Sequence, residues 1–136
     1  MTKKREIYRC SLCGNIVEVV HEGAVLSCCG RPMQLLDEQT KEGSYDKHVP
    51  IIEKVDGGFR VRVGSVEHPM AEFHYIQWIE FNTPRCVLRK ELFPGDKADV
   101  VFRLDKIETC CGTQAKCDET VVSARAYCNL HGLWHS

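Results

Sequence analysis

Cys128 and His131 lie three residues apart near the end of the sequence, in the run Cys-Asn-Leu-His-Gly-Leu-Trp. Upstream of them, every second residue from position 122 to position 126 is small or apolar. This period of two predicts a strand that carries Cys128 into the core, where a thiolate is costly unless a metal or hydrogen-bond donors hold its charge. A tight turn would bring His131 beside the sulfur and aim the N–H groups of Leu130 and His131 at it. We therefore interpret Cys128 and His131 as metal ligands.

The sequence contains nine cysteines, an odd number that argues against a fully paired disulfide framework and favours metal ligation. Four of them lie within residues 6–36, in a Cys-x-x-Cys and a Cys-Cys-Gly motif: Cys10, Cys13, Cys28 and Cys29. About thirty residues cannot bury enough apolar surface to fold alone, and a tetrahedral thiolate site would supply the missing cross-link. Gly14 and Gly30 each follow a cysteine, where we expect a tight turn.

The composition is that of an ordinary globular protein. The chain has 136 residues, 43% of them hydrophobic and 27% charged, which is enough for one domain plus a small appendage. The formal net charge of −1 does not favour a general nucleic-acid or membrane binder. No apolar run follows residues 1–5, so we expect no signal peptide, no transmembrane span and a cytoplasmic location.

Strand patterns dominate the chain after a polar stretch, residues 37–46, that is typical of a linker. Residues 59–63 alternate between apolar side chains and arginine, and Asp56-Gly57-Gly58 predicts a hairpin joining residues 49–55 to residues 59–66. Further strands are expected at residues 74–81, 98–104 and 120–128, and no long window has a helical period. The sequence thus predicts an all-β protein with a small N-terminal domain, residues 1–37, and a β-sandwich, residues 38–136.

Four histidines fall in the predicted sandwich: His48, His68, His74 and His131. Any one of them alone would be interpreted as an ordinary loop histidine. Four of them, together with the thiolate of Cys128, favour a second metal centre.

Four sequence blocks occur in order along the second domain: Lys47-His48-Val49-Pro50, Gly64-Ser65-Val66-x-His68-Pro69-Met70, His74-Tyr75-Ile76 and Cys128-Asn129-Leu130-His131-Gly132-Leu133-Trp134. With the four N-terminal cysteines they resemble the desulfoferrodoxin family, the two-iron superoxide reductases. The resemblance implies a desulforedoxin-like N-terminal domain and an immunoglobulin-like, neelaredoxin-like sandwich. It also implies one-electron reduction of superoxide to hydrogen peroxide, a rubredoxin-like electron donor and a homodimer.

By the same resemblance, two irons are expected. The first would be bound by Cys10, Cys13, Cys28 and Cys29. The catalytic iron would be bound in a plane by His48, His68, His74 and His131, with Cys128 axial and the opposite face open. Lys47 would attract superoxide and help order a proton-delivering water. Asp46 stands where the family usually has Glu, whose carboxylate can occupy the open position of the oxidised iron.

An insertion at residues 105–119 departs from the family and contains Cys110, Cys111 and Cys117. With Cys86 these make either a third metal site or a surface hairpin with free or paired thiols, and the weak pattern favours the hairpin.

Two other functions are compatible with parts of the sequence. One is a non-catalytic, rubredoxin-like iron electron carrier, and the other is a zinc-ribbon-like binding module. Zinc ribbons usually have two Cys-x-x-Cys pairs, whereas Cys28 and Cys29 are adjacent, and a zinc ribbon leaves the histidine group unexplained.

Overall fold

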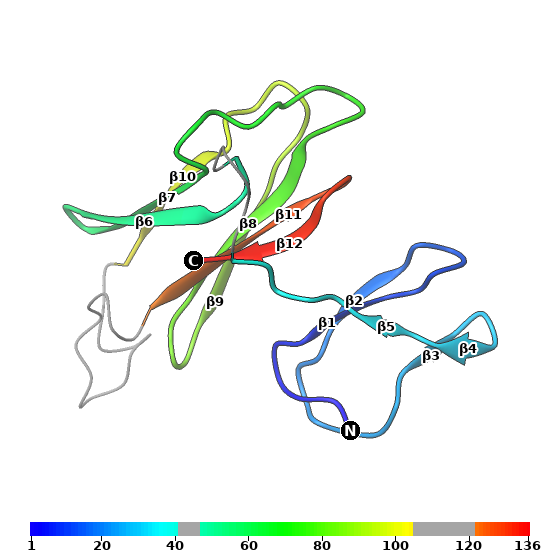
Figure 1. Cartoon of the computed structure of the whole chain (residues 1–136). Helices are drawn as coiled ribbons and strands as arrows, with labels where there is room; N and C mark the ends of the chain where they lie inside the picture. The colour runs from blue at the N-terminus through cyan, green and yellow to red at the C-terminus, as the bar shows by residue number, and fades with distance from the viewer. Residues whose placement is uncertain (41–46, 105–121) are drawn as a thin grey trace. The chain divides into compact units, whose positions relative to one another are not determined.

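The computed structural model describes residues 1–40, 47–104 and 122–136 (Figure 1). All regular elements in these ranges are β-strands, which confirms the all-β prediction. The chain divides into two compact units, Met1–Asp37 and Glu38–Ser136. The described part of the chain contains no helix that is long and apolar enough to cross a membrane.

The first unit is built from short antiparallel hairpins. Strand β1 (Ile7–Arg9) lies between β2 (Ile16–Glu18) and β5 (Gln34–Leu35), and β3 (Ser27–Cys28) pairs with β4 (Arg31–Pro32). Its buried apolar residues are few, and they include Ile7, Val19 and the ligand candidate Cys10. So small a core is consistent with a unit that needs a metal cross-link.

One sheet of the second unit contains β6 (Pro50–Val55), β7 (Gly58–Val63) and β10 (Asp99–Arg103), with β7 in the middle. The pair Val55↔Gly58 closes a two-residue turn, which confirms the predicted hairpin. Gly57 has a φ of 77°, and a Cβ atom on Gly58 would lie 2.0 Å from the carbonyl oxygen of Phe102. Only glycine therefore lets β10 approach this turn.

The other sheet has the order β12-β11-β8-β9. Its strands are β8 (Ile76–Asn82), β9 (Val87–Glu91), β11 (Ser123–Cys128) and β12 (Gly132–His135). The sequence pattern did not predict β9 or β12. A register shift between Tyr127 and Cys128 lets Cys128 pair with Ile76, and such an irregularity re-aims the side chains beside it.

The two sheets share one hydrophobic core. Inward side chains of β7 (Phe59, Val61 and Val63) pack with those of β8 and β11. Ala124, Ala126 and Cys128 are all fully buried, which confirms the inward face predicted for this strand. The inward face of β11 thus ends at the Cys128 thiol, which lies in the core.

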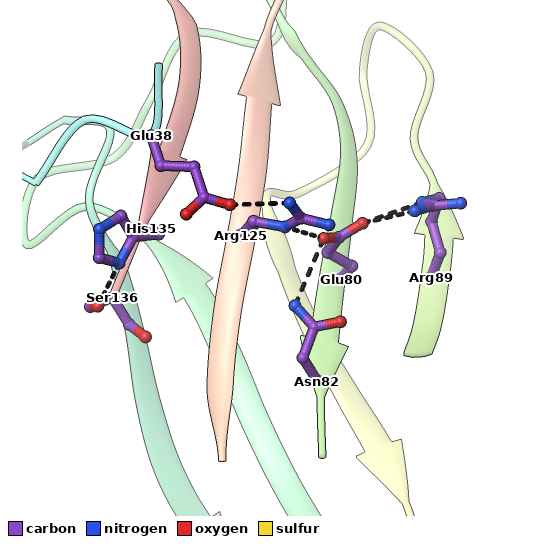
Figure 2. A network of polar contacts seen from close by, with 7 residues as sticks. All are labelled: Glu38, Glu80, Asn82, Arg89, Arg125, His135 and Ser136. Atoms are coloured by element: carbon purple, nitrogen blue, oxygen red, sulfur yellow. Dashed lines mark hydrogen bonds and ion pairs between the residues drawn. The ribbon is translucent and has the colours of Figure 1, made fainter. Parts of the chain in front are cut away.

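Residues 38 and 39 correct the linker prediction. The main chain of Gln39 pairs with β12, because its N–H donates to the oxygen of Leu133 (3.0 Å) and its oxygen accepts from the N–H of His135 (2.9 Å). Glu38 forms an ion pair with Arg125 at 2.7 Å (Figure 2). Polar side chains alone gave no sign that these residues belong to the sheet.

Candidate metal centres

Five predicted ligands of the second unit meet at one end of the sandwich. Their candidate ligand atoms all lie within 4.8 Å of one another: His48, His68, His74, Cys128 and His131. His48 comes just before β6, and His68 and His74 come from the connection between β7 and β8. Cys128 ends β11, and His131 lies in the turn into β12. Three separate chain segments therefore build this group.

The four imidazole rings occupy the corners of a square. Ring centroids of consecutive neighbours are 4.7 Å apart for His48–His68, His68–His74 and His48–His131, and 4.9 Å apart for His74–His131. The diagonal His48–His74 is 6.5 Å, close to the diagonal of a square with those sides. The Cys128 sulfur lies 3.6 Å from Nδ1 of His131. Four nitrogens and one sulfur thus surround a single point.

Hydrogen bonds indicate which ring atoms face that point. His68 Nδ1 lies 2.6 Å from the oxygen of Pro69, which leaves Nε2 for a metal. Nε2 of His68 and Nε2 of His74 are buried and have no hydrogen-bond partner among the described residues. Nε2 of His48 lies 3.1 Å from Nδ1 of His131. Buried nitrogens without a partner are costly, and a bound cation would satisfy them.

The electrostatics of the group also favour a cation. Burial, followed by the charges of the other imidazoles, lowers the pKa of His68 to about 4 despite the hydrogen bond to Pro69. Burial and the charges of His131, His48 and Lys47 lower the pKa of His74. Neutral imidazole is the form that binds metals.

The Cys128 thiol has opposing influences on its pKa. Burial raises that pKa, and hydrogen bonds from the N–H groups of Leu130 and His131 lower it. The turn therefore aims both N–H groups at the sulfur, as the sequence predicted. Because burial is the larger effect, a metal cation is needed to hold the thiolate.

The second predicted group lies in the first unit and consists of Cys10, Cys13, Cys28 and Cys29. The sulfurs of Cys13 and Cys28 are 3.6 Å apart, and those of Cys28 and Cys29 are 3.9 Å apart. A tetrahedral site with metal–sulfur bonds of about 2.3 Å has sulfurs about 3.8 Å apart, so the spacing suits four thiolates around one ion. None of the cysteines in the described ranges is in a disulfide.

Turn geometry positions these four thiols. Gly14 and Gly30 have positive φ angles of 81° and 75°, which confirms the tight turns expected after each cysteine pair. N–H groups of Cys13 and Leu12 lower the pKa of Cys10 to about 6. Hydrogen bonds with Cys13 and Cys28 are the main causes that raise the pKa of Cys29 to about 12. Four adjacent thiols therefore cannot all ionise without a cation.

Comparison with known proteins agrees with this geometry. Residues 40–136 match the family description "Desulfoferrodoxin", and residues 2–36 match "Desulfoferrodoxin, N-terminal domain". The chain belongs to the desulfoferrodoxin family. It is 50% identical to a desulfoferrodoxin of Syntrophotalea carbinolica, a match that covers 100% of this chain and 98% of that protein.

Two further similarities extend the comparison. The desulfoferrodoxin of Nitratidesulfovibrio vulgaris is 47% identical over 98% of this chain and 97% of its own. The crystal structure of the superoxide reductase from Treponema pallidum has a TM-score of 0.70 and 26% identity, covering 100% of this chain and 99% of that one. The two ligand groups fit the two mononuclear iron sites of desulfoferrodoxins, one with four Cys and one with four His and one Cys.

The remaining predicted residues belong to neither ligand group. Lys47 is exposed and directly precedes His48, which is buried. Asp46 lies outside the described residues, as do Cys110, Cys111 and Cys117 of the insertion. Cys86 is half-buried with a free thiol.

Asn129 is a supporting residue that the sequence analysis missed. Its Oδ1 accepts from the N–H of Tyr75 (3.0 Å), and its Nδ2 donates to the oxygen of Phe73 (3.0 Å). The side chain thereby joins the loop of His74 to the turn after Cys128. Its place inside the Cys-Asn-Leu-His run was the one available signal.

Proposed function

We propose that the chain reduces superoxide to hydrogen peroxide at the site formed by four histidines and Cys128. The observation that carries this proposal is the square of four imidazoles beside a buried sulfur, because a plain electron carrier needs only the four-cysteine site. When bound there, ferrous iron supplies one electron to superoxide, and two protons complete hydrogen peroxide. An external one-electron donor must then restore the ferrous state, unlike in dismutation.

The test combines metal analysis with rapid mixing. Pre-reduced protein with two irons per chain should consume superoxide in a bimolecular step. The oxidised protein should show a thiolate-to-iron absorption band in addition to the iron–tetrathiolate bands. A protein with the tetrathiolate bands alone would be the non-catalytic carrier, and a colourless zinc protein would be a binding module.

Lys47 is proposed to attract the superoxide anion to this site. Its side chain is exposed, it precedes His48, and its positive charge is one of the causes that lower the pKa of His74. With a net charge of −1, general steering of an anion by the whole protein is weak, so local charge must supply it.

Lys47→Ala is therefore expected to slow the reaction with superoxide about ten-fold and to flatten its dependence on ionic strength, since steering is screened by salt. The rate should be measured over a series of salt concentrations. Lys54→Ala removes an equal charge from an exposed position of β6 and should retain the native salt dependence. Equal behaviour of the two variants would exclude a local role for Lys47.

Asp46 is proposed to approach the open position of the oxidised iron. Asp is one methylene shorter than Glu, so we expect the ferric state to keep more water or hydroxide than a Glu at this position would allow. The ferric absorption band of Asp46→Ala and Asp46→Glu should therefore differ from the native band across a pH series. An unchanged spectrum in Asp46→Ala at every pH would exclude Asp46 as a ligand.

The four-cysteine site is proposed to be independent of the reaction with superoxide. Cys13→Ser should lose the first iron and loosen the first unit, since the remaining core there is small. The two ligand groups share no residue, so the pre-reduced variant should react with superoxide at a rate within a factor of about two of the native rate. Metal content and rapid mixing measure the two effects. Loss of the reaction in a variant with an intact second iron would show that the sites depend on each other.

The partners are proposed to be a rubredoxin-like electron donor and a second copy of the chain, in a cytoplasmic location. Phe73 and Leu130 are 83% and 61% exposed and directly precede the candidate ligands His74 and His131, so they offer a donor an apolar surface beside this ligand group. The first unit exposes Val20 (79%) and Val25 (67%), which is consistent with a homodimer. Sedimentation of the native protein would measure the oligomeric state.

A further inference from the structure

Gln39 contacts the turn that carries the ligand His131. Its side-chain Nε2 donates to the oxygen of His131 at 2.8 Å and lies 3.4 Å from the oxygen of Leu133. A Cβ atom on Gly132, which has a φ of 86°, would come within 3.2 Å of the same nitrogen. The amide group of Gln39 therefore packs directly on the turn between β11 and β12.

The oxygen of His131 has a second donor, the indole nitrogen of Trp134, at 3.1 Å. The indole ring stacks on the imidazole of His48, with centroids 4.8 Å apart and planes 18° apart. One carbonyl thus joins Gln39 to Trp134, and through the indole to a second ligand. Trp134 is only 6% exposed, so the indole has little freedom to move away from the His48 ring.

Neighbouring contacts fix Gln39 itself. Both its main-chain N–H and its main-chain carbonyl form hydrogen bonds with β12. The preceding residue, Glu38, forms an ion pair with Arg125 of β11 (Figure 2). Arg125 is 4% exposed and also binds the fully buried Glu80 of β8. A side chain anchored in this way can hold its amide in one place.

We propose that Gln39 is a positioning residue of the five-ligand iron site, which orients the imidazoles of His131 and His48 through the His131 carbonyl and the Trp134 indole. This inference rests on the proposed iron site but not on its reaction with superoxide. The His131 side chain belongs to the residue whose carbonyl Gln39 binds, so its orientation depends on that hydrogen bond. The orientation of the His48 ring depends on the indole that stacks on it. Loss of the amide donor should therefore disturb two corners of the imidazole square at once.

The experiment compares Gln39→Leu and Gln39→Glu with the native protein. Both variants keep the main-chain pairing with β12, and Gln39→Glu keeps the shape of the side chain but replaces the donor with an acceptor at neutral pH. Each should release the second iron to a chelator roughly five-fold faster, the factor expected for one net hydrogen bond, and should shift the thiolate-to-iron band of the ferric protein. Gln34→Leu makes the same change at an exposed position of β5 and should leave both readouts native.

Trp134→Phe supplies an independent arm, because phenylalanine keeps a ring against His48 but removes the N–H donor. Its effect and that of Gln39→Leu should be non-additive in the double variant, since both donors act on one oxygen. Native iron release and a native band in Gln39→Leu, with additive effects in the double variant, would overturn the proposal. Should Gln39→Leu fail to fold, Gln39→Glu and Trp134→Phe give the same two readouts. A native protein that binds both irons but does not react with superoxide would reject the proposed function and leave this test valid.

Discussion

Cys128→Ser should lower the rate of superoxide reduction by at least about 100-fold even when iron is bound, since the change removes a direct ligand and supporting partners alone are worth 10–100-fold. Serine oxygen is a harder ligand than thiolate and donates less electron density to the metal. The site is built for sulfur, because Cys128 is fully buried and receives the N–H groups of Leu130 and His131. Rapid mixing of the pre-reduced, iron-loaded variant with superoxide measures the effect.

The matched control is Cys86→Ser, which makes the same change at a half-buried free thiol. It should retain the native rate and the native thiolate-to-iron band. Metal analysis of both variants separates loss of iron from loss of reactivity. If iron-loaded Cys128→Ser reacts as fast as the native protein, the sulfur has no part in the reaction.

Glu80→Gln is expected to cost about 3–5 kcal/mol of unfolding free energy, the range for removing one partner of a buried ion pair. Glu80 is fully buried between two arginines, Arg125 of β11 and Arg89 of β9, which are its register partners on the neighbouring strands (Figure 2). Its Oε1 accepts from Arg125 Nε and its Oε2 from Arg89 Nη2 at 2.6 Å. Without this carboxylate, the buried guanidinium of Arg125 loses a charged partner, although it keeps its ion pair with the more exposed Glu38.

Denaturant unfolding of the iron-loaded protein, followed by circular dichroism, measures this loss. Glu53→Gln is the control, because Glu53 is an exposed partner of Arg60 at 3.8 Å and such surface pairs contribute about 0–1 kcal/mol. The double variant Glu80→Leu with Arg125→Leu should be more stable than Glu80→Gln, since no unpaired buried charge remains. A Glu80→Gln variant as stable as the control would show that the row of charges is not needed for folding.

Local spacing explains why much of the site could be predicted from the sequence. Cys-x-x-Cys, Cys-Cys-Gly and the Cys-to-His interval are short patterns, and each is closed by a turn of a few residues. The alternation that ends at Cys128 also predicted its burial, because side chains of a strand point alternately to its two faces. The hairpin at Gly57 was equally local.

Other features depend on contacts between distant segments, and only the tertiary structure decided them. The square of imidazoles requires His48, His68 and His131 to arrive from three separate segments, and no local pattern specifies that arrangement. Gln39 resembled a linker residue because its polarity is typical of linkers, yet its hydrogen bonds are made with residues more than ninety positions away. Glu80 lies between the apolar residues Ile79 and Phe81 of β8, and its role became visible only when the strand register placed an arginine on each side. The sequence by itself determined which side chains can bind the metals, and the pairing of strands decided which groups hold those side chains in place.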